Sequence, residues 1–213
     1  MKKILALILA SMMLLTLVAC GNTNNTSDEE TTTEAPSTVV EVKSAEDMLN
    51  ATVDAFLTEA APLFEMPVEE VMAYFNGGYY GESEDTHCIG AAKVVPLDNE
   101  YAIGALMSGT LISEANLEKI DDAALFTGMN ANNFTTFVYH VKNSADVATI
   151  ASDFESAVTN NMWFCGFPEI YFAIQVGDYI FAGFGLEAQV NVMKTAIAAT
   201  YENATVLCEG VIL

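Results

Sequence analysis

Two apolar runs joined by a glycine-led turn constrain the fold more than any other feature of this chain. Residues 170–176 and 179–184 are rich in β-branched and aromatic side chains, and Gly177-Asp178 separates them. A two-residue loop that begins with glycine is typical of a type II′ hairpin turn. The turn fixes the register and places Phe172 opposite Gly183, where the large ring fills the space that the glycine leaves.

The segments that flank this hairpin predict two strand–helix pairs. Residues 134–141 alternate as a strand should, and residues 204–208 form a last apolar strand. Each connecting helix carries one apolar stripe, the first with Val147, Ile150, Ala151, Phe154 and Val158, the second with Leu186, Val190, Met193 and Ile197. The order strand-helix-strand-strand-helix-strand predicts an α+β fold in which the C-terminal half is a ferredoxin-like βαββαβ unit, with an antiparallel sheet and both helices on one face.

The N-terminal half shows a weaker version of the same order. We expect a strand at 38–42, helices at 44–60, 68–75 and 113–120, and strands at 88–95, 101–107 and 123–129. Residues 40–47 resemble residues 139–146, because both run from a strand through Val-Lys into a capped helix. This half is therefore predicted to be a degenerate second copy packed against the first, with an insertion at 62–87.

The second face of the C-terminal sheet is apolar too. In the predicted register Tyr171, Ile180 and Phe184 lie on the face opposite Phe172. Because large exposed apolar patches are rare in monomers, something must cover this face. We expect the N-terminal half to cover it as a second layer, and the alternative is a partner protein or an apolar ligand.

The first twenty residues have the features of a secretory leader. Residues 4–18 are apolar, follow Lys2 and Lys3, and are too short for the ~20 residues of a membrane span. Leu17-Val18-Ala19-Cys20 resembles the lipobox of bacterial lipoproteins, which implies cleavage before Cys20 and a diacylglyceryl group on its thiol. The protein would then be lipid-anchored to the cell membrane, facing the extracytoplasmic side.

These observations divide the chain into four segments. Residues 1–19 are the signal peptide, and residues 20–37 are the lipidated Cys20 with a Thr/Asn/Glu-rich tether that we expect to be disordered. Residues 38–130 form the N-terminal α+β half, and residues 131–213 form the C-terminal βαββαβ half.

The charge of the chain restricts its partners. The formal net charge is −22, no arginine is present, and two of the seven lysines lie in the leader. This balance argues against nucleic acid, which needs clustered cations, and against anionic ligands or headgroups. A cationic partner is favoured over an anionic one, but our preferred interpretation is that the charge simply keeps the secreted domain soluble.

Outside the lipobox, the cysteines and the acidic cluster give no recognisable metal or catalytic motif. Cys88, Cys165 and Cys208 match no zinc or redox spacing, and we favour buried free thiols over a disulfide. Carboxylates, an imidazole and a thiol gather at 82–88, but hard and soft ligands are mixed there, so we expect a solvated acidic loop and no metal. His140 is predicted to be structural. We therefore predict no catalytic residue, no cofactor and no enzymatic activity.

The aromatic stretch at 162–168 is the best candidate for binding. It holds the only tryptophan and lies in a helix-to-strand connection, where binding residues are often found. The candidate ligand-binding residues are Trp163, Phe164, Phe167 and Tyr171. We nevertheless favour the interpretation that these side chains pack at the edge of the sheet, against the N-terminal half.

The layout resembles a family of small lipoproteins from Gram-positive gut bacteria whose shared domain has no assigned function. The resemblance covers roughly residues 123–185 and rests on the strand at 137–142, the helix after it and the turn at 177–180. It implies a surface lipoprotein and supplies no mechanism. We expect a lipid-anchored, non-enzymatic binding or interaction module for an unknown protein or small molecule; the alternative is an accessory substrate-binding lipoprotein of a transporter.

Overall fold

The computed structural model describes residues 43–75, 92–98 and 112–212. All of them belong to one unit of the chain, Glu41–Leu213, and the other unit, Met1–Val40, lies outside the described residues. The predicted leader, Cys20, the predicted tether and the acidic cluster at 82–88 therefore fall outside the description, as do the strands expected at 38–42 and 101–107. Within the described residues, no helix is both long and apolar enough to cross a membrane.

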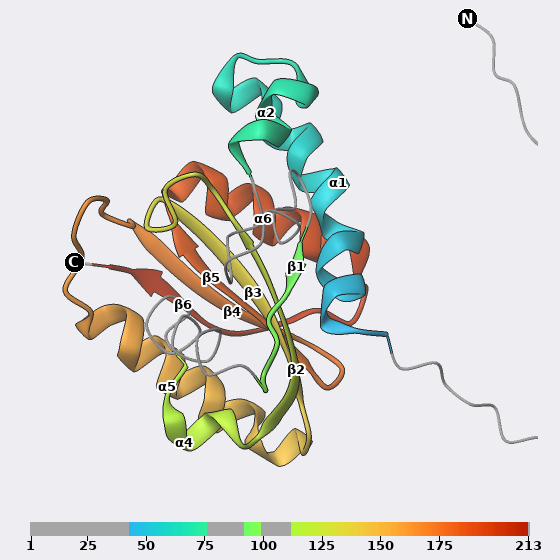
Figure 1. Ribbon diagram of the computed structural model, residues 1–213, viewed down its shortest axis with the longest axis vertical. Coiled ribbons are helices and arrows are strands. Elements are labelled where there is room, and N and C mark those ends of the chain that lie inside the picture. Colours follow the sequence, from blue (N-terminus) through green and yellow to red (C-terminus); the bar gives the residue numbers. More distant parts are fainter. Residues whose placement is uncertain (1–42, 76–91, 99–111, 213) are drawn as a thin grey trace, which may run out of the picture. The chain divides into compact units, whose positions relative to one another are not determined.

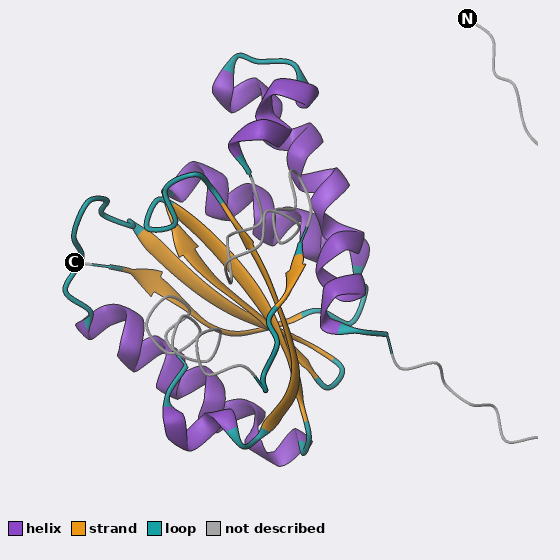
Figure 2. Ribbon diagram, in the orientation of Figure 1, coloured by secondary structure: helices purple, strands orange, loops and turns teal. Residues whose placement is uncertain are grey.

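A six-stranded antiparallel sheet forms the centre of the fold (Figure 2). In spatial order the strands are β1 (Lys93–Val94), β2 (Ile120–Thr127), β3 (Phe134–Val141), β5 (Tyr179–Gly185), β4 (Ile170–Val176) and β6 (Thr205–Val211). Every neighbouring pair is antiparallel. Together with the helices this sheet confirms the predicted α+β class, and β2 and β3 join the two predicted halves in one sheet.

The hairpin of β4 and β5 has the predicted register. Phe172 lies opposite Gly183. In the turn, Gly177 has a φ of 60° and the φ of Asp178 is not positive, which is the combination that a type II′ turn requires. A Cβ atom on Gly183 would lie only 2.7 Å from Cε1 of Phe172. The phenylalanine ring therefore occupies the space that a side chain at position 183 would need.

Helices α5 (Val147–Asn160) and α6 (Glu187–Thr200) lie on opposite faces of the sheet (Figure 1). Phe154 of α5 packs with Tyr171 in one core cluster, whereas Met193 of α6 packs with Phe172 in the other. This arrangement differs from the ferredoxin-like unit expected from the sequence, in which both helices share one face.

The strand order explains the difference. The connection from β3 through α5 to β4 crosses over β5. The connection from β5 through α6 to β6 crosses over β4. Both connections therefore run across the sheet in the same direction. The strands from which the two connections start, β3 and β5, are antiparallel. Because such crossovers are almost always right-handed, two of them with this geometry place their helices on opposite faces. Strand β6 lies beside β4 because β2 already occupies the outer edge of β3.

Two strands of the N-terminal half extend the sheet, and its helices cover parts of both faces. Helix α1 (Ala45–Phe64) lies beside α6 on one face with the shorter α2 (Val68–Tyr74), and α4 (Glu114–Leu117) lies on the face of α5 (Figure 1). The face that carries Tyr171 is therefore covered by α5, not by the bulk of the N-terminal half as expected. That this half is a second copy stays a prediction, since several of its expected strands fall outside the described residues.

Helix α1 is fixed at its first turn by its own capping residues and by contacts to two other segments. Ser44 and Asp47 form the predicted capping box, and the backbone N–H of Ala45 donates to Oδ2 of Asp122 at 2.6 Å. The hydroxyl of Tyr179 donates to the carbonyl of Lys43. These contacts tie the start of α1 to β2 and to the turn of the β4–β5 hairpin.

Each face of the sheet has its own apolar core. Under α1 and α2 the rings of Phe56, Phe75, Phe126 and Phe134 pack against one another with centroids 4.8 to 6.0 Å apart. Under α5 the core includes Phe137, Phe154, Tyr171 and Phe184. With the central strands buried on both faces, the edges and end loops of the sheet remain as surfaces for contact with a partner.

Candidate interaction surface

The loop between α5 and β4 presents large apolar side chains to solvent. Met162 is 73% exposed, Phe164 64% and Phe167 73%. Exposure on this scale is unusual for phenylalanine, which is normally among the more buried residues. The three side chains therefore form a surface that the fold itself does not use.

Two asparagine side chains hold the backbone of this loop. Nδ2 of Asn130 donates to the carbonyl of Cys165 at 2.6 Å, and Nδ2 of Asn132 donates to the carbonyl of Phe164 at 2.5 Å. Both asparagines lie in the turn between β2 and β3. The turn thus fixes the segment that carries the exposed rings, which lowers the entropy cost of binding through them.

Glycine is required where the loop meets this turn. Gly166 has a φ of 153°, and a Cβ atom there would lie 2.8 Å from Cβ of Asn132. Cys165, just before it, has a φ of 59°, in the left-handed region. The close approach of the two loops is therefore specified by Gly166.

Trp163 and Pro168 attach the loop to the core. The indole ring of Trp163 packs on Phe184 with centroids 4.8 Å apart, and Pro168 is buried. The indole N–H of Trp163 is buried and finds no hydrogen-bond acceptor among the described residues. Trp163 therefore supports the exposed side chains more than it joins them.

Tyr171 belongs to the core and lies apart from the exposed side chains. It is 5% exposed, and its hydroxyl donates to Oε1 of Glu155 at 2.5 Å. Burial, reinforced by the hydrogen bond to Glu155 and the charge of its carboxylate, raises the pKa of Tyr171 to about 12. The predicted group of four is thus divided into exposed Phe164 and Phe167, half-buried Trp163 and buried Tyr171.

Met129 joins the exposed side chains and was not predicted. It is 69% exposed and immediately precedes Asn130, which is bonded to the loop. We refer to Met129, Met162, Phe164 and Phe167 together as the apolar surface. The sequence did contain a signal for its exposure, because Met129 directly precedes the Asn-Ala-Asn-Asn turn, and residues next to such polar turns lie at the surface.

The two described cysteines carry free thiols in different surroundings. Cys165 is exposed, which corrects the expectation that it is buried. Cys208 is half-buried, its Sγ donates to the carbonyl of Ala151 at 3.7 Å, and burial followed by the charge of Glu155 raises its pKa to about 11. Cys88 lies outside the described residues.

His140 is packed and hydrogen-bonded. Its Nδ1 lies 2.5 Å from Oδ1 of Asp121, and its ring packs 4.8 Å from that of Tyr179. Within the described residues, no three His, Cys, Asp or Glu side chains are grouped so as to hold a metal ion. The apolar surface is therefore the strongest candidate site among the described residues.

Comparison of the chain with known protein families, with curated proteins and with solved structures found no match.

Proposed function

We propose that this protein is a lipid-anchored, extracytoplasmic binding module without enzymatic activity, and that it contacts a partner protein through the apolar surface. The observation that carries the proposal is the exposure of Met162, Phe164 and Phe167 on a backbone held by Asn130 and Asn132. Aromatic and methionine side chains are enriched at the centres of protein interfaces, where a few of them supply most of the binding energy.

The charge around the surface favours a basic partner. Glu169 is the last residue of the exposed loop, two positions after Phe167, and its Oε2 accepts the backbone N–H of Glu187 at 2.8 Å. The whole chain carries a formal charge of −22. A partner with an apolar pocket and a basic rim would be complementary, and electrostatic steering would speed its association.

The anchor is tested at Cys20. In the full-length protein Cys20→Ala should abolish lipoprotein-type cleavage and the partitioning of the mature chain into detergent. A Cys20→Ala protein that loses its leader and still partitions into detergent would contradict the anchor.

The partner is tested by photo-crosslinking on intact cells. p-Benzoylphenylalanine replaces Phe164 in the full-length protein, and the matched control carries it at Thr149, an exposed residue near the other end of α5. We expect a discrete protein adduct from position 164 and none from position 149. Adducts with lipid alone, or the same adducts from both positions, would contradict a protein partner at this surface.

A further inference from the structure

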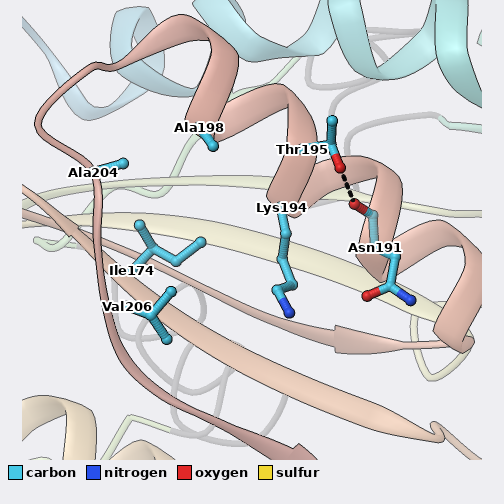
Figure 3. Close-up of a pocket in the computed structure, with 7 residues that line it drawn as sticks. All are labelled: Ile174, Asn191, Lys194, Thr195, Ala198, Ala204 and Val206. Carbon is cyan, nitrogen blue, oxygen red and sulfur yellow. Dashed lines mark hydrogen bonds between the residues drawn. The ribbon is translucent and has the colours of Figure 1, made fainter.

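An open groove of about 480 Å³ lies between α6 and the strands β4 and β6 (Figure 3). Its apolar part consists of Ile174, Val206, Ala198 and Ala204. Asn191, Lys194 and Thr195 of α6 supply the polar part, and Figure 3 shows the side chain of Lys194 directed toward the strands. The groove is separate from the apolar surface of the α5–β4 loop.

Strand β6 is the last strand of the sheet beside this groove. The backbone N–H of Ile212 donates to the carbonyl of Glu169 and so faces the β4 side. Because successive residues of an antiparallel strand direct their N–H and C=O groups to alternate sides, those of Glu209 and Val211 point away from β4. Within the part of the chain that the structure describes, no strand pairs with this outer side. An added strand would gain backbone hydrogen bonds from β6, and the groove would receive its side chains at alternate positions.

Charge decides which occupant fits. Glu209 of β6 lies on the groove side of the sheet, where its carboxylate pairs with Lys194, and the chain as a whole carries a formal charge of −22. Because that ion pair leaves little local charge, the net negative charge of the chain decides: it would repel a second copy or an acidic peptide and attract a basic segment. We propose that β6 and the groove bind an extended, basic peptide segment of a partner as an additional strand.

The probe is a fluorescent heptapeptide in which valine and lysine alternate, titrated against the full-length protein in detergent micelles by fluorescence polarisation. A matched peptide replaces each lysine with glutamate. We expect saturable binding of the basic peptide and, because of like-charge repulsion, binding about tenfold weaker or worse for the acidic one.

Two pairs of variants separate the groove from the strand edge. Ala198 and Ala199 are both exposed on α6, but only Ala198 lines the groove, so Ala198→Leu should weaken binding about tenfold and Ala199→Leu should leave it unchanged. Val211→Pro removes an outward N–H without touching the bonds to β4, whereas Val211→Ala keeps that N–H. Only the proline variant should lose most of the binding.

Three results would overturn this proposal. One is the absence of saturable binding of the basic peptide up to about 1 mM, the weak limit of specific recognition. Another is equal loss of binding in Ala198→Leu and Ala199→Leu. The third is a dimer in sedimentation velocity that Val211→Pro dissociates, which would assign the edge to a second copy of the chain.

Discussion

The substitution Gly183→Ala tests the packing between the two central strands. A methyl group at this position would lie 2.7 Å from Cε1 of Phe172, 2.7 Å from the carbonyl oxygen of Thr135 and 2.9 Å from Oγ1 of Thr136. The phenylalanine ring can turn aside, but the Thr135 carbonyl belongs to the neighbouring strand and can move only if the sheet distorts. The substitution should therefore destabilise the fold.

The expected magnitude follows from two opposing effects. Overpacking a buried site costs about 1–3 kcal/mol. Replacing glycine by alanine returns about 0.4–1 kcal/mol by restricting the unfolded chain. The net loss should be about 1.3 kcal/mol, which for a chain of this length lowers the melting temperature by roughly 3–5 °C.

Urea unfolding followed by circular dichroism measures this loss, and a double-mutant cycle identifies its source. Phe172→Leu shortens the ring side chain and relieves one of the three close contacts, so the double variant should be about 1 kcal/mol more stable than the sum of the single effects. A Gly183→Ala protein as stable as the wild type, or effects that simply add, would refute the packing argument.

Three further predictions follow from single contacts. The pKa of Tyr171 is raised to about 12, against 10.0 for the free side chain. The neutral hydroxyl therefore stabilises the fold fully below pH 10, and this stabilisation is lost as the pH rises through 12. When the free energy of unfolding is measured against pH in alkaline solution, it should fall less in Tyr171→Phe than in the wild type. In a Cys20→Ser/Cys88→Ser background, Ellman's reagent should label Cys165 at once and the half-buried Cys208 much more slowly, with unfolding accelerating only Cys208. Ser44→Ala should cost about 1 kcal/mol in urea unfolding through loss of the α1 cap, and equal stability would contradict that role.

In the C-terminal half, local sequence signals predicted the order of the elements and the register of the β4–β5 hairpin correctly. The two-residue turn at Gly177 set the pairing of β4 with β5, and the apolar stripes set the buried faces of α5 and α6. The face of the sheet against which each helix packs could not be predicted from these local signals. It depends on β2 occupying the outer edge of β3. These strands are consecutive in the chain, but the predicted boundary at residue 130 assigned them to separate halves and so omitted their pairing.

The candidate site was likewise predicted only where a local sequence signal marks it. Phe164 and Phe167 lie in an irregular loop, so composition alone indicated a surface. Tyr171 was grouped with them by its position in the sequence, although strand alternation already placed it on the face of Phe184. The hydrogen bonds from Asn130 and Asn132 join segments more than thirty residues apart and required the structure.

The most direct test of the proposed binding role removes the exposed rings while keeping the fold. Full-length protein carrying p-benzoylphenylalanine at Met162 is crosslinked on cells with the native loop and with Phe164→Ser/Phe167→Ser. Both rings are largely exposed, so the melting temperature should not change, whereas the loss of two interface side chains should lower the yield of the protein adduct about tenfold or more. An unchanged adduct yield in the double variant would contradict binding through the apolar surface.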